Sequence, residues 1–197
     1  MRLALATILG LSAILSSCAD RPPTGDAASR GMATLRTSSD GMAALRTSSD
    51  GERVRIQDDC DPATFDAVLG PGACLGKGDT TFQEFIAELT ATKIAEDWKF
   101  DDDHFSVAPG SRITATNRGG ETHTFTQVAN FGGGFVPALN ALSGNPTPVP
   151  ECSFPAVGSS FVPPGGSRAG TAPAGGTVKF QCCIHPWMRA VATVKDD

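Results

Sequence analysis

The sequence predicts an all-β fold, a Greek-key β-sandwich that follows a disordered tether and a small helical segment. Three observations support this prediction. From residue 98 onward, short alternating or β-branched runs are separated by Gly, Pro and Asn, which is the pattern of strands joined by turns. An amphipathic run with helical spacing precedes them, and a repetitive polar stretch comes before that run. With 197 residues, 40% of them hydrophobic, the chain can bury one sizeable core.

Residues 1–17 have the form of a secretory signal peptide. Arg2 supplies positive charge, and the apolar run over residues 3–15 is too short to remain as a membrane-spanning helix. The run ends in Leu-Ser-Ser-Cys at residues 15–18, which resembles the bacterial lipobox, where the cysteine thiol is acylated. We therefore expect a lipoprotein of the cell envelope, anchored to the membrane through Cys18 and facing the periplasm or the exterior. Ordinary secretion with an unmodified Cys18 is the alternative.

Residues 18–57 are expected to form a flexible linker. Within them, GMATLRTSSD is followed directly by GMAALRTSSD, a tandem repeat whose period is too short for a solenoid unit. Ser, Thr, Gly and Pro are abundant and apolar residues are sparse, so this stretch cannot bury enough surface to offset its ordering entropy. We interpret it as a tether that holds a folded module away from a lipid anchor.

Residues 58–96 are expected to form a small helical segment. Cys60 and Cys74 enclose a short predicted helix and a Gly/Pro-rich loop. A capping box at residues 81–84 and apolar residues at helical spacing predict an amphipathic helix over residues 82–96. We interpret this helix as a structural lid. The segment is acidic, which we interpret as a solvated face, with a contact surface for a basic partner as the alternative.

Residues 97–197 are expected to form the β-sandwich. Between residues 132 and 176, eight prolines predict long loops with one or two irregular strands. Several short strands separated by turns are typical of a sandwich. The regular strands are predicted over residues 98–100, 105–107, 112–117, 122–128, 177–182 and 190–195.

Four side chains that bind metals come together if these strands form. Successive side chains of a strand point to opposite faces, so Cys182 faces inward and Cys183 outward. The same alternation places His123 on the inner face of a second strand. His185 and Met188 lie in the stretch that directly follows the strand of Cys182. One thiolate, two imidazoles and one thioether are the ligand set that suits a copper ion cycling between two oxidation states.

The spacing of these residues resembles that of the cupredoxins, the small type 1 blue copper proteins. Cys182-x-x-His185-x-x-Met188 looks like their C-terminal ligand loop and is most similar to that of amicyanin. Plastocyanins place two more residues between the histidine and the methionine. Upstream, Asn117 and His123 match the family's Asn-x₅-His motif.

This resemblance covers about residues 97–197 and implies one type 1 copper ion. It also implies that Asn117 ties the two ligand loops together by hydrogen bonds. His185 lies beside Pro186 and Trp187 in what is expected to be a surface loop, so the resemblance implies that it is the port for electrons. The implied copper ligands are His123, Cys182, His185 and Met188.

Other metal sites agree less well with the sequence. Zinc accepts cysteine and histidine but rarely recruits a methionine such as Met188. A dicopper centre needs two cysteines that face the metal, which the adjacent Cys182 and Cys183 cannot both do. A multicopper oxidase needs many histidines, and this chain has three. The third of them, His104, follows three aspartates and is interpreted as a solvated turn residue.

The six cysteines divide by role. Cys18 is assigned to lipid and Cys182 to copper. Four cysteines remain for disulfides, and their connectivity cannot be derived from the sequence. The two pairings considered are Cys60–Cys74 with Cys152–Cys183, and Cys60–Cys152 with Cys74–Cys183.

These features predict a carrier of single electrons between redox partners such as a cytochrome or a copper enzyme. We expect a monomeric domain that is not an enzyme, because nothing in the sequence provides an open substrate pocket beside Cys182. The net charge of -5 gives no indication of nucleic acid binding. The alternatives are a copper storage or delivery protein, although Met-rich and His-rich tracts are missing, and a binding module with a vestigial copper site.

Overall fold

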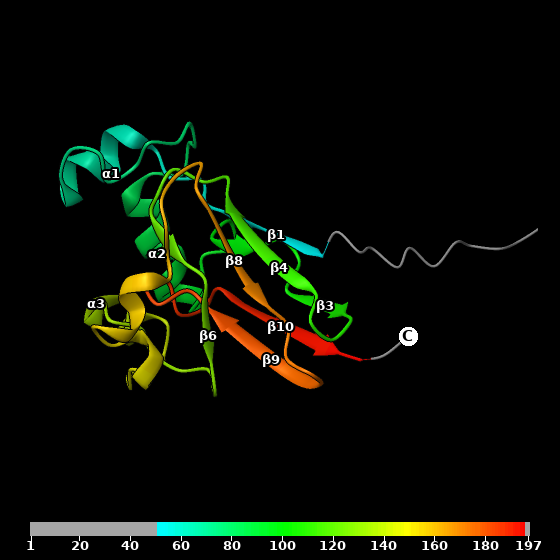
Figure 1. Ribbon diagram of the computed structural model, residues 1–197. Helices are drawn as coiled ribbons and strands as arrows, with labels where there is room; N and C mark the ends of the chain where they lie inside the picture. The colour runs from blue at the N-terminus through cyan, green and yellow to red at the C-terminus, as the bar shows by residue number, and fades with distance from the viewer. Residues whose placement is uncertain (1–50, 196–197) are drawn as a thin grey trace, which may run out of the picture. The chain divides into compact units, whose positions relative to one another are not determined.

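The computed structural model describes residues 51–195 (Figure 1). The predicted signal peptide, Cys18 and the tandem repeat lie outside the described residues. Within that part of the chain, no helix combines the length and the apolar character needed to cross a membrane.

Two four-stranded sheets form a sandwich, and their inner faces share one core of buried apolar side chains (Figure 1). The first sheet has the order β2 (Lys99–Phe100), β1 (Glu52–Gln57), β4 (Arg112–Asn117) and β8 (Ser167–Thr171). The second has the order β3 (His104–Val107), β10 (Arg189–Val194), β9 (Gly176–Gln181) and β6 (Thr126–Val128). A separate short pair joins β5 (His123–Thr124) to β7 (Phe161–Val162).

The chain alternates between the two sheets. It passes from β2 in the first sheet to β3 in the second and returns to the first with β4. Strand β1 pairs in parallel with β4, and β10 pairs in parallel with β3, so hydrogen-bonded neighbours come from distant parts of the sequence. Alternate residues of β4 and β10 are buried, as expected for strands with one face on a core. The predicted all-β Greek-key sandwich is confirmed.

The predicted end of the tether is wrong, because β1 begins at Glu52. Val54 and Ile56 are fully buried, and β1 lies between β2 and β4 in the first sheet. The stretch ERVRIQ alternates charged and apolar residues, which is a strand pattern of period two. The pattern is short and polar residues outnumber apolar ones in it, so composition alone predicts a linker.

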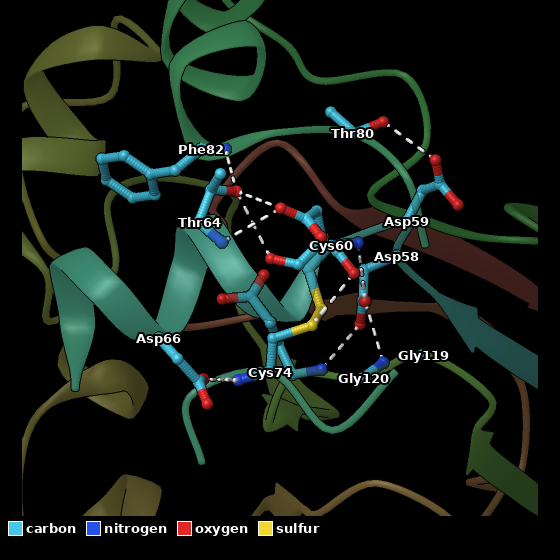
Figure 2. Close-up of a disulfide and its surroundings, with 12 residues drawn as sticks. Asp58, Asp59, Cys60, Thr64, Asp66, Cys74, Thr80, Phe82, Gly119 and Gly120 are labelled. Carbon is cyan, nitrogen blue, oxygen red and sulfur yellow. Dashed lines mark hydrogen bonds between the residues drawn. A yellow bond between two sulfur atoms is a disulfide. The ribbon is translucent and has the colours of Figure 1, made fainter. Parts of the chain in front are cut away.

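The helical segment contains two helices, α1 (Pro62–Leu69) and α2 (Phe82–Thr92). The capping box is confirmed, because Thr81 and Glu84 each accept a hydrogen bond from the other's backbone N–H. Helix α2 was predicted to reach residue 96, but it ends at Thr92 because Lys93 takes a left-handed conformation with φ 70°. The disulfide Cys60–Cys74 ties the start of α1 to the following loop (Figure 2).

The helical segment is part of the sandwich unit rather than a domain of its own. Phe65, Phe85 and Leu89 are buried in the same core as the strand residues. The ring centre of Phe85 lies 4.5 Å from that of Trp98, the residue directly before β2. All described residues fall within one compact unit. The predicted boundary at residue 97 therefore marks where helices are followed by strands, but it does not separate two hydrophobic cores.

The proline-rich region forms a second, smaller core beside the sandwich. It contains α3 (Pro137–Leu142) and two 3₁₀ turns, η1 (Pro150–Cys152) and η2 (Ala156–Ser159). Cys152 and Cys183 form a disulfide within this small core. Cys183 faces away from the main core as predicted, but it is fully buried rather than outward in solvent, because these loops cover that side of β9. Of the two pairings considered, the structure has Cys60–Cys74 with Cys152–Cys183.

Candidate metal centre

Three side chains from separate elements converge inside the sandwich at the end nearest the helical segment. His123 opens β5, Cys182 directly follows β9, and His185 lies in the turn between β9 and β10. This turn is closed by two backbone hydrogen bonds: Cys182 donates to the carbonyl of Met188 at 3.0 Å, and Met188 donates to the carbonyl of His185 at 2.9 Å. These two hydrogen bonds give the loop a defined shape.

The ligand atoms of the three residues form a small triangle. Cys182 Sγ lies 3.8 Å from Nδ1 of His123 and 3.8 Å from Nδ1 of His185, and the two Nδ1 atoms are 3.2 Å apart. All three side chains are buried, with residue exposures of 0%, 0% and 2% for His123, Cys182 and His185. Ligands at about 2.0–2.3 Å from one ion in a common plane are separated by roughly 3.5–4 Å. The triangle therefore has the size of a three-ligand metal site.

The electrostatics of this cluster favour a thiolate. Burial raises the pKa of Cys182, but hydrogen bonds and positive charge from His123 and His185 outweigh burial and hold that pKa well below its ordinary value. For His123, burial lowers the pKa, but the hydrogen bonds to Asp58 and Cys182, with their negative charges, raise it to about 9. Both shifts favour an imidazolium beside a thiolate. A metal ion bound at Nδ1 of His123 would displace the proton on that nitrogen.

Thr124 joins the two ligand-bearing segments. Its backbone N–H points to Cys182 Sγ at 3.4 Å, and its hydroxyl accepts a hydrogen bond from the backbone of Cys183 at 2.7 Å. Asn117 was predicted to make this connection. The Asn117 side chain is buried but bonds instead to Glu121 O at 2.7 Å, to Val162 O at 2.9 Å and to Gly119 N at 2.9 Å. It orders the loop before His123 and fastens that loop to β7.

The other two candidate residues occupy different environments. The Met188 side chain is buried, with 1% exposure, at the end of the ligand loop. Its role as a ligand stays a prediction. His104 is exposed at the start of β3, where its ring contacts Asp103 at 3.1 Å, and it is not part of the cluster. It was expected in a turn, and it lies in a strand.

No family model and no curated protein matches this chain. Several solved structures are similar to it in fold. They include a reduced Cu(I) form of an amicyanin variant, with 22% identity over 52% of this chain and 77% of that chain and a TM-score of 0.33. A purple cupredoxin from Nitrosopumilus maritimus has 17% identity over 52% of this chain and 87% of that chain, with a TM-score of 0.38.

These likenesses cover about half of this chain, and its architecture is established by its own two sheets, which form a β-sandwich around one core.

The helical segment forms a lid over His185, and this corrects the expectation that His185 lies in a surface loop as an electron port. His185 has only 2% exposure. Phe85 of α2 packs edge-on against its ring, with centroids 6.4 Å apart, and Trp187 lies 5.3 Å away. The Trp187 indole donates a hydrogen bond to Ala95 O at 3.2 Å, which fastens the ligand loop to the helical segment. Sequence position indicated a surface loop, but contacts about 90 residues apart cover it.

Two carboxylates near the cluster were missed by the sequence analysis. Asp58 Oδ2 lies 2.8 Å from Nε2 of His123, and Glu121 Oε2 lies 3.7 Å from Nε2 of His185. Glu121 falls within the predicted Asn-x₅-His stretch, so its closeness to the site had a local signal. Asp58 had none, because 65 residues separate it from His123.

Proposed function

We propose that this protein is a copper-containing electron carrier of the cell envelope, with one type 1 copper ion held by His123, Cys182, His185 and Met188. The observation that carries the proposal is the buried triangle of one thiol and two imidazole Nδ1 atoms. In a plane of two histidines and one cysteine with a weak axial thioether, copper supplies a one-electron couple that needs little rearrangement.

The chain's own residues keep the ligands in place. The ligand loop is closed by its backbone hydrogen bonds, and Thr124 links it to β5. The Cys152–Cys183 disulfide fixes the residue directly after Cys182. Ligands held in this way change position little between the two oxidation states of the metal, which is what rapid electron exchange requires.

The burial of the cluster favours a carrier over an enzyme or a copper courier. Cys182 has no exposure, so a substrate does not reach the thiolate, and ligand exchange with an acceptor requires the lid to open first. Electrons, in contrast, pass through packed side chains. We propose that a redox partner, a cytochrome or a copper enzyme, docks over Trp187, the half-buried ring beside His185.

The cell-envelope location is part of the same proposal. The apolar run before Cys18 supports export and acylation, and two disulfides among the described residues are typical of an oxidising compartment. Mass spectrometry of the native N-terminus tests this point. An unmodified mature chain that starts elsewhere would remove the lipid anchor but leave export in place.

Spectroscopy of the copper-loaded protein tests the metal centre. We expect the oxidised protein to be intensely blue or green and to lose its colour on reduction, because the Cys182 thiolate binds Cu(II). Cys182→Ser should be colourless. The double variant Cys152→Ser/Cys183→Ser is the matched control and should keep the colour. A coloured Cys182→Ser protein would refute the assignment.

The axial position has its own test. Met188→Gln should keep copper bound and coloured but lower the reduction potential, because an oxygen ligand favours Cu(II) over Cu(I). Competition with a Cu(I) chelator, run beside voltammetry, measures both quantities. A large loss of Cu(I) affinity with rapid transfer to an acceptor would instead indicate copper delivery.

A further inference from the structure

Each imidazole of the candidate copper site has a carboxylate at its outer nitrogen. Asp58 Oδ2 is 2.8 Å from His123 Nε2, which is hydrogen-bonding distance. Glu121 Oε2 is 3.7 Å from His185 Nε2, so it acts through its charge rather than through a direct hydrogen bond. Both outer nitrogens point away from the Cys182 sulfur, toward which the two Nδ1 atoms converge.

The position of Asp58 is built by the fold. Its side chain is 1% exposed, and it accepts hydrogen bonds from the backbone of Gly120 at 2.8 Å and of Glu121 at 3.1 Å. Figure 2 shows Asp58 next to the Cys60–Cys74 disulfide, with Gly119 and Gly120 at its carboxylate. A Cβ on Gly119 would lie 1.9 Å from Asp58 Oδ2, so only glycine allows the carboxylate to approach this loop.

This contact sets which nitrogen of His123 faces the metal site. A carboxylate only accepts hydrogen bonds, so His123 must donate its Nε2 proton to Asp58. Nδ1 is then the nitrogen that faces Cys182 Sγ at 3.8 Å and is available to a metal ion. An outer carboxylate also makes a histidine ligand more electron-donating.

The two carboxylates beside the site carry charge of the same sign, so their effects on a bound metal add. Glu121 accepts a hydrogen bond from the buried Trp98 indole, which holds its carboxylate near His185. Among residues 51–195, neither carboxylate has a lysine or arginine partner. Two negative charges beside the imidazoles therefore join the thiolate of Cys182. Negative charge in a buried site stabilises the more positive oxidation state of a metal.

We propose that Asp58 is a positioning residue of the copper centre, which fixes the tautomer of His123 and, together with Glu121, lowers the reduction potential of the site. The proposal rests on the function proposed above. It gives the helical segment a second role besides covering His185, because the segment delivers Asp58 from its first residue and holds it through the adjacent disulfide.

Three full-length variants test the proposal. Asp58→Asn removes the charge and places an amide at His123. Glu121→Gln removes the second charge while its carbonyl still accepts from Trp98. Asp66→Asn is the matched control: this carboxylate lies in the same segment and accepts from the backbone of Gly72 and Cys74, but it has no contact with the cluster.

Voltammetry and chelator competition measure the effect on the copper couple. We expect Asp58→Asn to shift the ratio of Cu(II) to Cu(I) affinity at least tenfold toward Cu(I), which is about 59 mV higher in reduction potential for a one-electron couple. Glu121→Gln should shift it in the same direction by less, and it provides the test if Asp58→Asn does not fold. Asp66→Asn should leave the potential unchanged.

A metal-free measurement separates this inference from the proposed function. In ¹⁵N-edited NMR spectra of the metal-free protein, His123 should show a slowly exchanging Nε2 proton that is lost in Asp58→Asn and kept in Asp66→Asn. If the protein forms no coloured copper site although this proton is present, the proposed function is wrong. If the copper couple is normal and Asp58→Asn and Glu121→Gln behave like Asp66→Asn, the tuning role is wrong while the function stands.

Discussion

The two histidines of the cluster are held in different ways. His123 is held by polar contacts: its outer nitrogen meets Asp58, and Asp58 is fastened to backbone N–H groups. His185 is held by aromatic rings, those of Phe85 and Trp187. The difference indicates a division of labour in which the polar side sets geometry and charge, whereas the aromatic side controls access and leads toward the surface.

Removing one of the aromatic rings beside His185 should have the largest effect on stability and on access to the site. Phe85→Ala should lower the free energy of unfolding by about 3–5 kcal/mol, since a large buried side chain leaves a cavity. It should also open His185 to solvent and speed the loss of copper to a chelator. Chemical unfolding and stopped-flow chelation measure the two effects.

Phe125→Ala is the control for this prediction. Phe125 is buried in the sandwich core, stacked on Phe180 at 4.3 Å. We expect a similar loss of stability but little change in the rate of chelation. Equal acceleration in both variants would show that copper loss follows global unfolding and that the lid does not guard His185.

The two disulfides allow the next comparison, because Cys60–Cys74 lies beside Asp58 whereas Cys152–Cys183 lies in the separate small core directly after Cys182. Removing Cys60–Cys74 or Cys152–Cys183 by paired serine substitutions should cost about 3–4 kcal/mol each, since both close loops of moderate length. Only loss of Cys60–Cys74 should raise the reduction potential, because it loosens Asp58. A potential shift of equal size in both double variants would mean that the polar side does not depend on this disulfide.

Local sequence signals predicted one side of the site better than the other. The Cys-x-x-His-x-x-Met loop lies within seven residues, so its candidate ligands could be predicted from one short motif. The capping box of α2 was equally local. Asp58, the strand β1 and the cover over His185 depend on contacts between residues far apart in the chain. Such contacts are decided by the packing of the whole core, which no short pattern records.

The pH dependence of the metal-free protein tests the thiolate and imidazolium pair. In the folded state the pKa of His123 is raised to about 9 and that of Cys182 is lowered well below 9.0. Between about pH 6.5 and 8.5, the ordinary pKa values of an unfolded imidazole and an unfolded thiol, the folded chain keeps an imidazole proton that the unfolded chain has lost, and its lowered thiol pKa makes it bind less of the thiol proton that the unfolded chain keeps. These opposite contributions cancel, so the free energy of unfolding should be nearly constant over that range.

Below pH 6.5 the cancellation ends. The unfolded imidazole is then also protonated and only the thiol difference remains, so stability should fall, by at most about 1.4 kcal/mol per pH unit, as the pH decreases toward the lowered pKa of Cys182. In Cys182→Ala only the His123 contribution remains, and Asp58 still raises its pKa. Stability of that variant should instead fall as the pH rises above 6.5. Urea unfolding of both metal-free proteins between pH 5 and 9 measures these slopes, and parallel curves would disprove the charged pair.

The smallest expected effect concerns the single hydrogen bond that fastens the ligand loop to the lid. Trp187→Phe keeps an aromatic ring beside His185 but removes the indole donor to Ala95 O, at a cost of about 0.5–1.5 kcal/mol. Because the polar side is untouched, the visible spectrum and the reduction potential should stay as in wild type, while chelation of copper becomes modestly faster. Thr90→Ala is the control, since it removes a hydroxyl from the exposed part of α2 that bonds only within the helix. A changed reduction potential in Trp187→Phe, with an unchanged one in Thr90→Ala, would show that the aromatic side also sets the reduction potential of the site.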